Sequence, residues 1–165
     1  MNSGALDLSN SIIDYIGGLV QNVSVALSPK PGRVVTLAPG ATAAFDDCCA
    51  GQVWGRLVNL MPAPGATPGR TPGLSPAAAP WWLATIEIGI VRCAAVLDDQ
   101  GRAPTPAAIT ADGEQGIADL AAILSVLRCE PIRSFEGWLP VGPEGGCFGG
   151  TLTITVQVQN CLDCG

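Results

Sequence analysis

The 165-residue chain contains no histidine and a single lysine, Lys30. Histidine is the usual proton-transfer group at neutral pH, so its absence excludes Ser-His-Asp and Cys-His catalysis. Charged residues make up only 13% of the chain, about half of the usual share of roughly 25%. The net charge is −6, which excludes a basic stripe that neutralises nucleic-acid phosphates. So low a charge density favours a chain that buries surface against copies of itself or against partners.

Long apolar runs and the usual catalytic motifs are also missing. No apolar run reaches the roughly 18 residues of a membrane span, and the first residues lack the basic region of a signal peptide. We therefore expect no membrane contact and synthesis in a cytoplasm. No phosphate-binding G-x-x-x-x-G-K-S/T pattern occurs, and the paired carboxylates at 46–47 and 98–99 favour solvated turns. We predict that the protein is not an enzyme and needs no cofactor.

The seven cysteines are an odd number in a chain without an export signal, which argues against an obligatory disulfide scaffold. Cys161 and Cys164 form a C-x-x-C, and Cys48 and Cys49 are adjacent. Four thiolates could hold zinc, but adjacent cysteines cannot easily offer both sulfurs to one tetrahedral ion, so we predict no metal. Cys93 and Cys129 are plausible neighbours. The candidates for buried thiols or disulfides are Cys93, Cys129, Cys161 and Cys164.

Hydrophobic periodicity predicts two helices, over about 8–23 and 107–129, the second beginning at Thr105 and Pro106. Alternation predicts strands at 33–37, 52–60, 81–96 and 151–159, with Leu57 and Leu60 on opposite faces of the second strand. Residues 61–80 carry six prolines and three glycines, which excludes a helix or a central strand. This order predicts one α+β domain over residues 1–165. Two helices cover a mixed, mostly antiparallel sheet, and a long Pro/Gly-rich loop interrupts it.

The predicted core follows from the same periodicities. It includes the buried tryptophan Trp54. The sheet is expected to contribute Leu57, Ile86, Ile88, Ile90, Leu152, Ile154, Val156 and Val158. The helices are expected to cover it with Ile12, Ile16, Leu120, Leu124 and Leu127.

Two segments, 61–80 and 138–150, are rich in glycine and proline, and we predict that both are contact arms outside the core. Aromatic side chains at such places are favoured as interface anchors, and we assign Trp138 to an interface. The candidate interface residues are Trp81, Trp82, Trp138, Arg70 and Phe148.

Three stretches, FDDCCAGQVWGRL (45–57), IEIGIVRC (86–93) and GWLPVGPEGGCFGGTLTITVQV (137–158), together with the order of elements, resemble head-to-tail joining proteins of long-tailed actinobacterial phages. Within that group the chain looks most like a tail terminator. The resemblance implies a homohexameric ring that caps the tail tube and binds the head connector, or stopper. It also implies a place in the virion after assembly in the host cytoplasm.

A ring of this kind lets DNA pass without specific binding, and the negative charge of this chain suits such a lumen. Two alternatives remain open. One is another neck component, such as the stopper or a head-completion protein. The other is a small zinc-binding regulatory module.

Overall fold

The computed structural model describes residues 6–7, 11–63 and 81–159. Its strands form one sheet in the order β1-β6-β4-β3-β2, with β5 also paired to β6. The strands are β1 (Leu6–Asp7), β2 (Arg33–Thr36), β3 (Gln52–Pro62), β4 (Trp81–Cys93), β5 (Ile132–Glu144) and β6 (Cys147–Gln159). The helices are α1 (Ser11–Ala26) and α2 (Pro106–Leu127), with a short 3-10 turn, η1 (Cys48–Ala50).

The predicted α+β class is confirmed. The β1–β6 and β2–β3 pairs are parallel and the other pairs are antiparallel. Residues 64–80, which hold most of the predicted Pro/Gly-rich loop, lie outside the described residues. Among the described residues no helix has the length and apolar character needed to cross a membrane.

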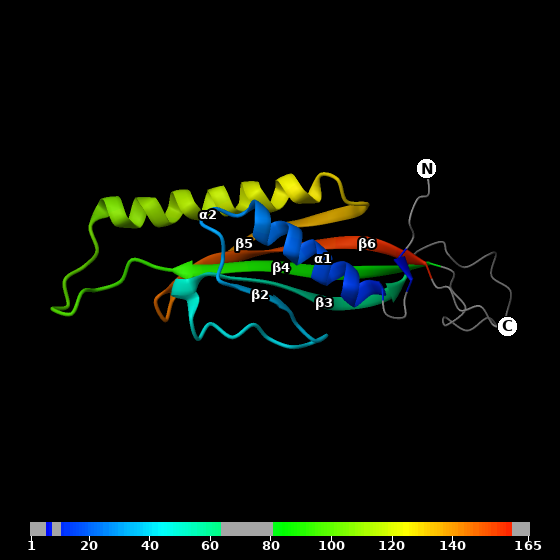
Figure 1. Cartoon of the computed structure of the whole chain (residues 1–165), viewed down its shortest axis with the longest axis horizontal. Helices are drawn as coiled ribbons and strands as arrows, with labels where there is room; N and C mark the ends of the chain where they lie inside the picture. Colours follow the sequence, from blue (N-terminus) through cyan, green and yellow to red (C-terminus); the bar gives the residue numbers. More distant parts are fainter. Residues whose placement is uncertain (1–5, 8–10, 64–80, 160–165) are drawn as a thin grey trace, which may run out of the picture.

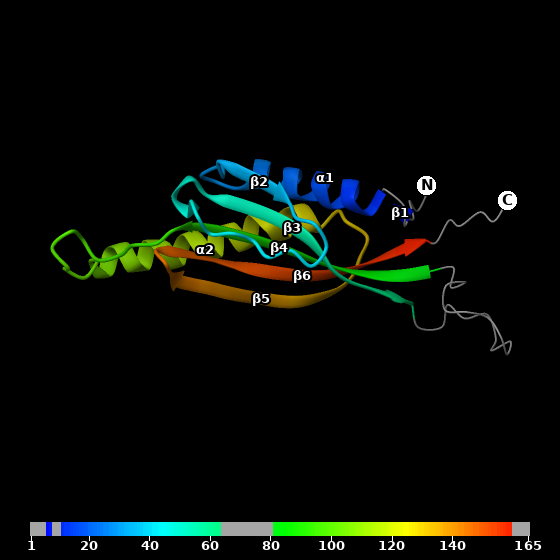
Figure 2. The ribbon, with the colours of Figure 1, turned by 90° about the horizontal axis from the view of Figure 1, so that it is seen from below.

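Strands β4 and β6 form the long axis of the sheet. They pair over their whole length, from Trp81 opposite Gln159 to Cys93 opposite Cys147. The two ends of the sheet are therefore called the Trp81 end and the Cys147 end. Strand β3 finishes at the Trp81 end, whereas the turn between β5 and β6 lies at the Cys147 end (Figure 2).

Both helices lie over one face of the sheet, and the main core fills the space between them and the strands (Figure 1). Helix α1 approaches β3 closely at Gly55, where an added Cβ would come within 2.4 Å of Val20 and 2.8 Å of Ile16. Glycine at this position therefore sets the distance between helix and sheet. The predicted core residues that the structure buries are Ile12, Ile16, Ile86, Ile88, Ile90, Leu127, Leu152, Ile154, Val156 and Val158.

The predicted inward face of α2 is partly wrong. Leu124 is 41% exposed and Leu120 is half-buried, whereas the buried positions of this helix are Asp119, Ile123 and Leu127. These three residues follow one another at intervals of four and so share one helix face. A carboxylate occupies that face because Arg92 of β4 pairs with it, at 2.6 Å between Arg92 Nε and Asp119 Oδ2. The start of α2 is as predicted, since the Thr105 hydroxyl accepts a hydrogen bond from the Ala108 N–H at 3.2 Å.

Strand β3 also departs from simple alternation. Its pairing with β4 shifts register between Leu57 and Asn59. An extra residue in one strand moves the following side chains to the other face. Leu57 and Leu60 therefore both pack against the main core, whereas alternation placed them on opposite faces.

The prediction that 138–150 is a loop outside the core is wrong. These residues belong to β5, its turn and the start of β6, and Trp138 packs against the main core. The pairing of β5 with β6 carries several register shifts, and Gly137 and Gly142 have positive φ values of 67° and 97°. Bulges and glycines of this kind let an edge strand contain prolines, which is why the composition resembled a loop.

Candidate interaction groove and the disulfides beside it

The first half of α2 stands away from the β5–β6 hairpin and leaves a cavity of about 490 Å³ between them. We call it the α2–hairpin groove. Trp138, Val141 and Phe148 line it from the hairpin, and Ile109 and Ile117 line it from the helix. Most of the remaining lining is glycine, proline and alanine, so the walls of the groove are mostly apolar.

Trp138 is fixed in the groove by the backbone beneath it. An added Cβ at Gly150 of β6 would lie 2.3 Å from the Trp138 indole, so the ring occupies the space that a side chain at Gly150 would need. The ring is partly buried, and it contacts the main core as well as the groove. Trp138 is thus both a packing residue and a wall of an open cavity.

The helix side of the groove exposes large apolar side chains. Ile109 is 57% exposed and Ile117 is 65% exposed. They lie eight residues apart on α2, with Gly113 midway between them, so they share one helix face. Clustered apolar exposure of this kind is typical of interaction sites.

Asp112 is the charged residue of the groove lining. One of its carboxylate oxygens, Oδ2, accepts a hydrogen bond from the Ala95 N–H at 2.7 Å. This bond holds the connection that follows β4 against α2. The groove therefore combines apolar walls with a single negative charge.

A second recess, of about 410 Å³, also reaches Phe148 but has mixed polar character. Its lining includes Lys30, Arg92 and the bridge between Cys49 and Cys93. Asp112 contributes to this lining as well, so charges of both signs face the recess.

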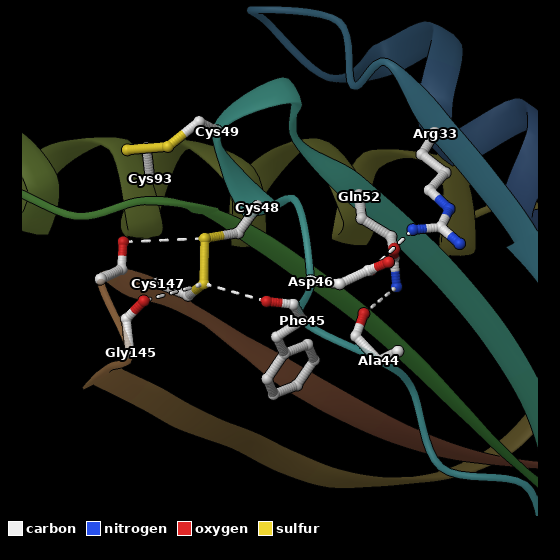
Figure 3. Close-up of a disulfide and its surroundings, with 11 residues drawn as sticks. Arg33, Ala44, Phe45, Asp46, Cys48, Cys49, Gln52, Cys93, Gly145 and Cys147 are labelled. Atoms are coloured by element: carbon white, nitrogen blue, oxygen red, sulfur yellow. Dashed lines mark hydrogen bonds and ion pairs between the residues drawn. A yellow bond between two sulfur atoms is a disulfide. The ribbon is translucent and has the colours of Figure 1, made fainter.

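Two disulfides tie the η1 turn to the Cys147 end of the sheet (Figure 3). Cys48 is bonded to Cys147 across 99 residues of sequence, and its adjacent neighbour Cys49 is bonded to Cys93 across 44 residues. Cys93 and Cys147 are register partners on neighbouring strands. The adjacent cysteines of η1 thus reach two different strands.

The odd number of cysteines argued against an obligatory disulfide scaffold, yet the structure contains two disulfides. Cys93 is in a disulfide, but its partner is Cys49, and Cys129 is exposed and forms no disulfide with any cysteine that the structure describes. Cys161 and Cys164 lie outside the described residues. Within the described residues no cluster of three or more side chains is arranged to hold a metal ion.

The connection before η1 covers the other face of the sheet at this end. Trp54 is buried there with Val91 and the Cys48–Cys147 bridge, as predicted for a core tryptophan. Its ring fits because Gly89 has no side chain, since an added Cβ would lie 2.1 Å from the indole.

A small polar network anchors the Trp54 indole. Glu87 Oε1 accepts a hydrogen bond from Trp54 Nε1 at 3.3 Å, and Glu87 Oε2 accepts one from Arg56 Nη2 at 3.0 Å. This face is therefore held by a disulfide, a buried indole and an ion pair.

The structure brings together two of the five candidate interface residues, Trp138 and Phe148, in the α2–hairpin groove. Trp81 and Trp82 begin β4 at the opposite end of the sheet, where both are partly buried and Trp82 packs against the main core. Arg70 lies outside the described residues.

Sequence reasoning missed Ile109, Ile117 and Asp112 as groove residues. The signal was present, because α2 carries more large apolar residues than one inward face can bury. A periodic pattern identifies an apolar stripe, but it does not show which part of the stripe stands away from the sheet.

No protein-family model matches the chain, and a search of curated proteins finds no match either.

Proposed function

We propose that the protein is a structural component of a phage virion that forms a ring at the head-proximal end of the tail. In this role it ends growth of the tail tube and joins the tail to the head connector. The observation that carries the proposal is the exposed apolar surface of α2 along the α2–hairpin groove. Ile109 and Ile117 are 57% and 65% exposed.

Such a surface suits a protein that functions in contact with copies of itself. Closed rings bury one patch of each subunit against a different patch of the next. The sheet of each subunit ends at β2 on one side and at β5 on the other. Neighbouring subunits can pack on these two edges. The net charge of −6 per subunit adds up around a ring and favours the passage of DNA without adhesion.

The disulfides support a role outside the reducing cytoplasm. Disulfides persist in oxidising surroundings, and a released virion is exposed to such surroundings outside the cell. The two disulfides at the Cys147 end would hold η1 against the sheet in the released particle.

The test is electron microscopy of particles made without the gene. Loss of a tail terminator predicts tails of irregular and excessive length. Full-length, unattached tails beside heads that leak DNA would instead show a stopper or head-completion protein. Normal infectious particles would reject a role in the neck altogether. Expression of the wild-type chain from a plasmid is the control, and it should restore normal tails.

A further inference from the structure

We propose that the α2–hairpin groove binds residues 64–80 of a second copy of the chain, an inference that rests on the proposed self-assembly. The segment reads PGATPGRTPGLSPAAAP, with a proline at every fourth position from 64 to 80. Proline restricts φ before binding, so a proline-rich segment loses little conformational entropy when it docks. Apolar grooves walled by aromatic rings are the surfaces that such segments recognise.

The groove has the matching chemistry. Trp138 and Phe148 supply aromatic rings, and Ile109 and Ile117 supply exposed aliphatic surface that nothing in the described subunit covers. A proline or leucine from the segment would bury this surface without bringing a charge into it.

The charges of the segment and of the groove are opposite in sign. Arg70 is the charged residue of segment 64–80, and Asp112 is the charged residue of the groove lining. One carboxylate oxygen of Asp112 is engaged by the Ala95 N–H. The carboxylate can still accept a hydrogen bond from a guanidinium.

The positions of the segment's two ends limit how much of the segment could reach the groove of its own subunit. The Ala63 N–H donates to the Trp81 carbonyl at 3.0 Å, so both ends are held at the Trp81 end of the sheet. A closed segment of this length reaches about 30 Å at full extension, at roughly 3.3 Å per residue for half of its residues. Trp138, at the near end of the groove, is opposite Leu152, which is opposite Ile88. It therefore lies about 23 Å along the sheet from Trp81, at roughly 3.3 Å per residue, whereas Gly149, opposite Val91, lies about 33 Å away.

A segment stretched to its limit would bring its tip to the Trp138 end of its own groove, and it could not lie along the length of the groove. A neighbouring copy has no such restriction. Each copy would then offer its segment to one neighbour and its groove to another, which is the head-to-tail arrangement that closes into rings.

The experiment compares sedimentation of four full-length proteins, with Ile117→Arg as a fifth that tests the groove a second time. Gly113→Trp fills the groove at a lining position where an added Cβ meets nothing within 4 Å. Gly18→Trp is the matched control, because it is an exposed helical glycine of α1 with equally open space. The third protein replaces Pro68, Pro72 and Pro76 with serine, and the fourth is the wild type.

We expect the wild type and Gly18→Trp to sediment as assemblies, and the groove and segment variants to sediment as monomers. An equimolar mixture of the two defective variants should form a one-to-one complex, because one intact groove and one intact segment remain. Ile117→Arg, at an exposed position, should behave like Gly113→Trp. It tests the groove independently if Gly113→Trp does not fold. Circular dichroism should show that every variant is folded.

Several results would overturn the inference. These are assembly of either defective variant at wild-type strength, a mixture that stays monomeric, or a wild type that is monomeric at all concentrations. If the groove variants fail to assemble but the segment variant still assembles, another ligand occupies the groove. The tail-length phenotype is independent of these outcomes. Overlong tails without the gene, together with normal assembly of the groove variants, would reject this inference and leave the proposed function intact.

Discussion

Arg92 of β4 and Asp119 of α2 form a buried, bidentate ion pair. Arg92 Nε donates to Asp119 Oδ2 at 2.6 Å, and Arg92 Nη2 donates to Asp119 Oδ1 at 2.7 Å. Gln115 Nε2 donates to the same Asp119 Oδ1 and to the Ser28 carbonyl, both at 2.9 Å. One carboxylate thus joins the central strand, the second helix and the chain that follows the first helix.

We expect Asp119→Ala to lower the free energy of unfolding by about 3–5 kcal/mol, because it leaves the Arg92 guanidinium buried without a partner. Urea denaturation should measure this loss. The double variant Arg92→Met with Asp119→Leu should recover most of it, since apolar side chains of similar volume can replace a buried pair. Equal destabilisation by the single and double variants would contradict the account, because it would mean that the charges themselves stabilise the fold.

The two disulfides should differ in their reactivity toward a thiol reductant. Cys49 and Cys93 are exposed, whereas Cys48 and Cys147 are only 6% and 2% exposed. Thiol–disulfide exchange requires access to a sulfur atom, so a mild dithiol should reduce the Cys49–Cys93 bond first. Alkylation at successive times, followed by peptide mass analysis, gives the order. Simultaneous release of all four thiols would show that the exposed bond is not the weak point.

Removal of the buried disulfide should be costly. The Cys48–Cys147 bond spans 99 residues of sequence, and a loop of this length is worth about 4–5 kcal/mol in the chain-entropy account. We expect the Cys48→Ser, Cys147→Ser pair to lower the free energy of unfolding by several kcal/mol in oxidising buffer. In a strong reductant the variant and the wild type should converge, and a difference that persists there would point to packing.

The only tyrosine of the chain reports on the corner between the helices. The Tyr15 hydroxyl donates to Glu130 Oε2 at 2.8 Å. Burial raises the pKa of Tyr15 well above its ordinary value near 10, and the Glu130 carboxylate raises it further. The folded state therefore holds this proton more tightly than the unfolded state. The stabilisation of the folded state by the protonated Tyr15 hydroxyl is complete below about pH 10. It is lost as the pH rises through the pKa of Tyr15 in the folded state.

Tyrosinate absorbance should accordingly develop at higher pH in the folded protein than in denaturant. Glu130→Gln should bring the pKa part of the way back, because it removes the neighbouring charge. Coincident titrations of folded and unfolded chains would show that α1 does not reach Glu130 in solution.

The central sheet offers a direct test of which face is buried. Ile88 is fully buried in the main core, whereas Val58 of β3 is 51% exposed. An unpaired carboxylate in the core costs several kcal/mol, comparable with the total stability of a domain. We expect Ile88→Asp to abolish soluble folding and Val58→Asp to be tolerated, as judged by soluble yield and circular dichroism. Soluble, folded Ile88→Asp protein would refute the assignment of the core.

The sequence by itself determined the elements whose periodicity is local. Alternation along 86–90 and 152–158 placed those side chains in the core, and Thr105 and Pro106 marked where α2 begins, because these signals depend on neighbours in the chain. Tertiary contacts decided the rest. Asp119 turns inward because Arg92 lies opposite it, and residues 138–144 form a strand because β6 supplies their partners. The disulfide pairs and the groove beside Trp138 likewise join residues far apart in sequence, and their distances are set when the sheet closes and not by any local pattern.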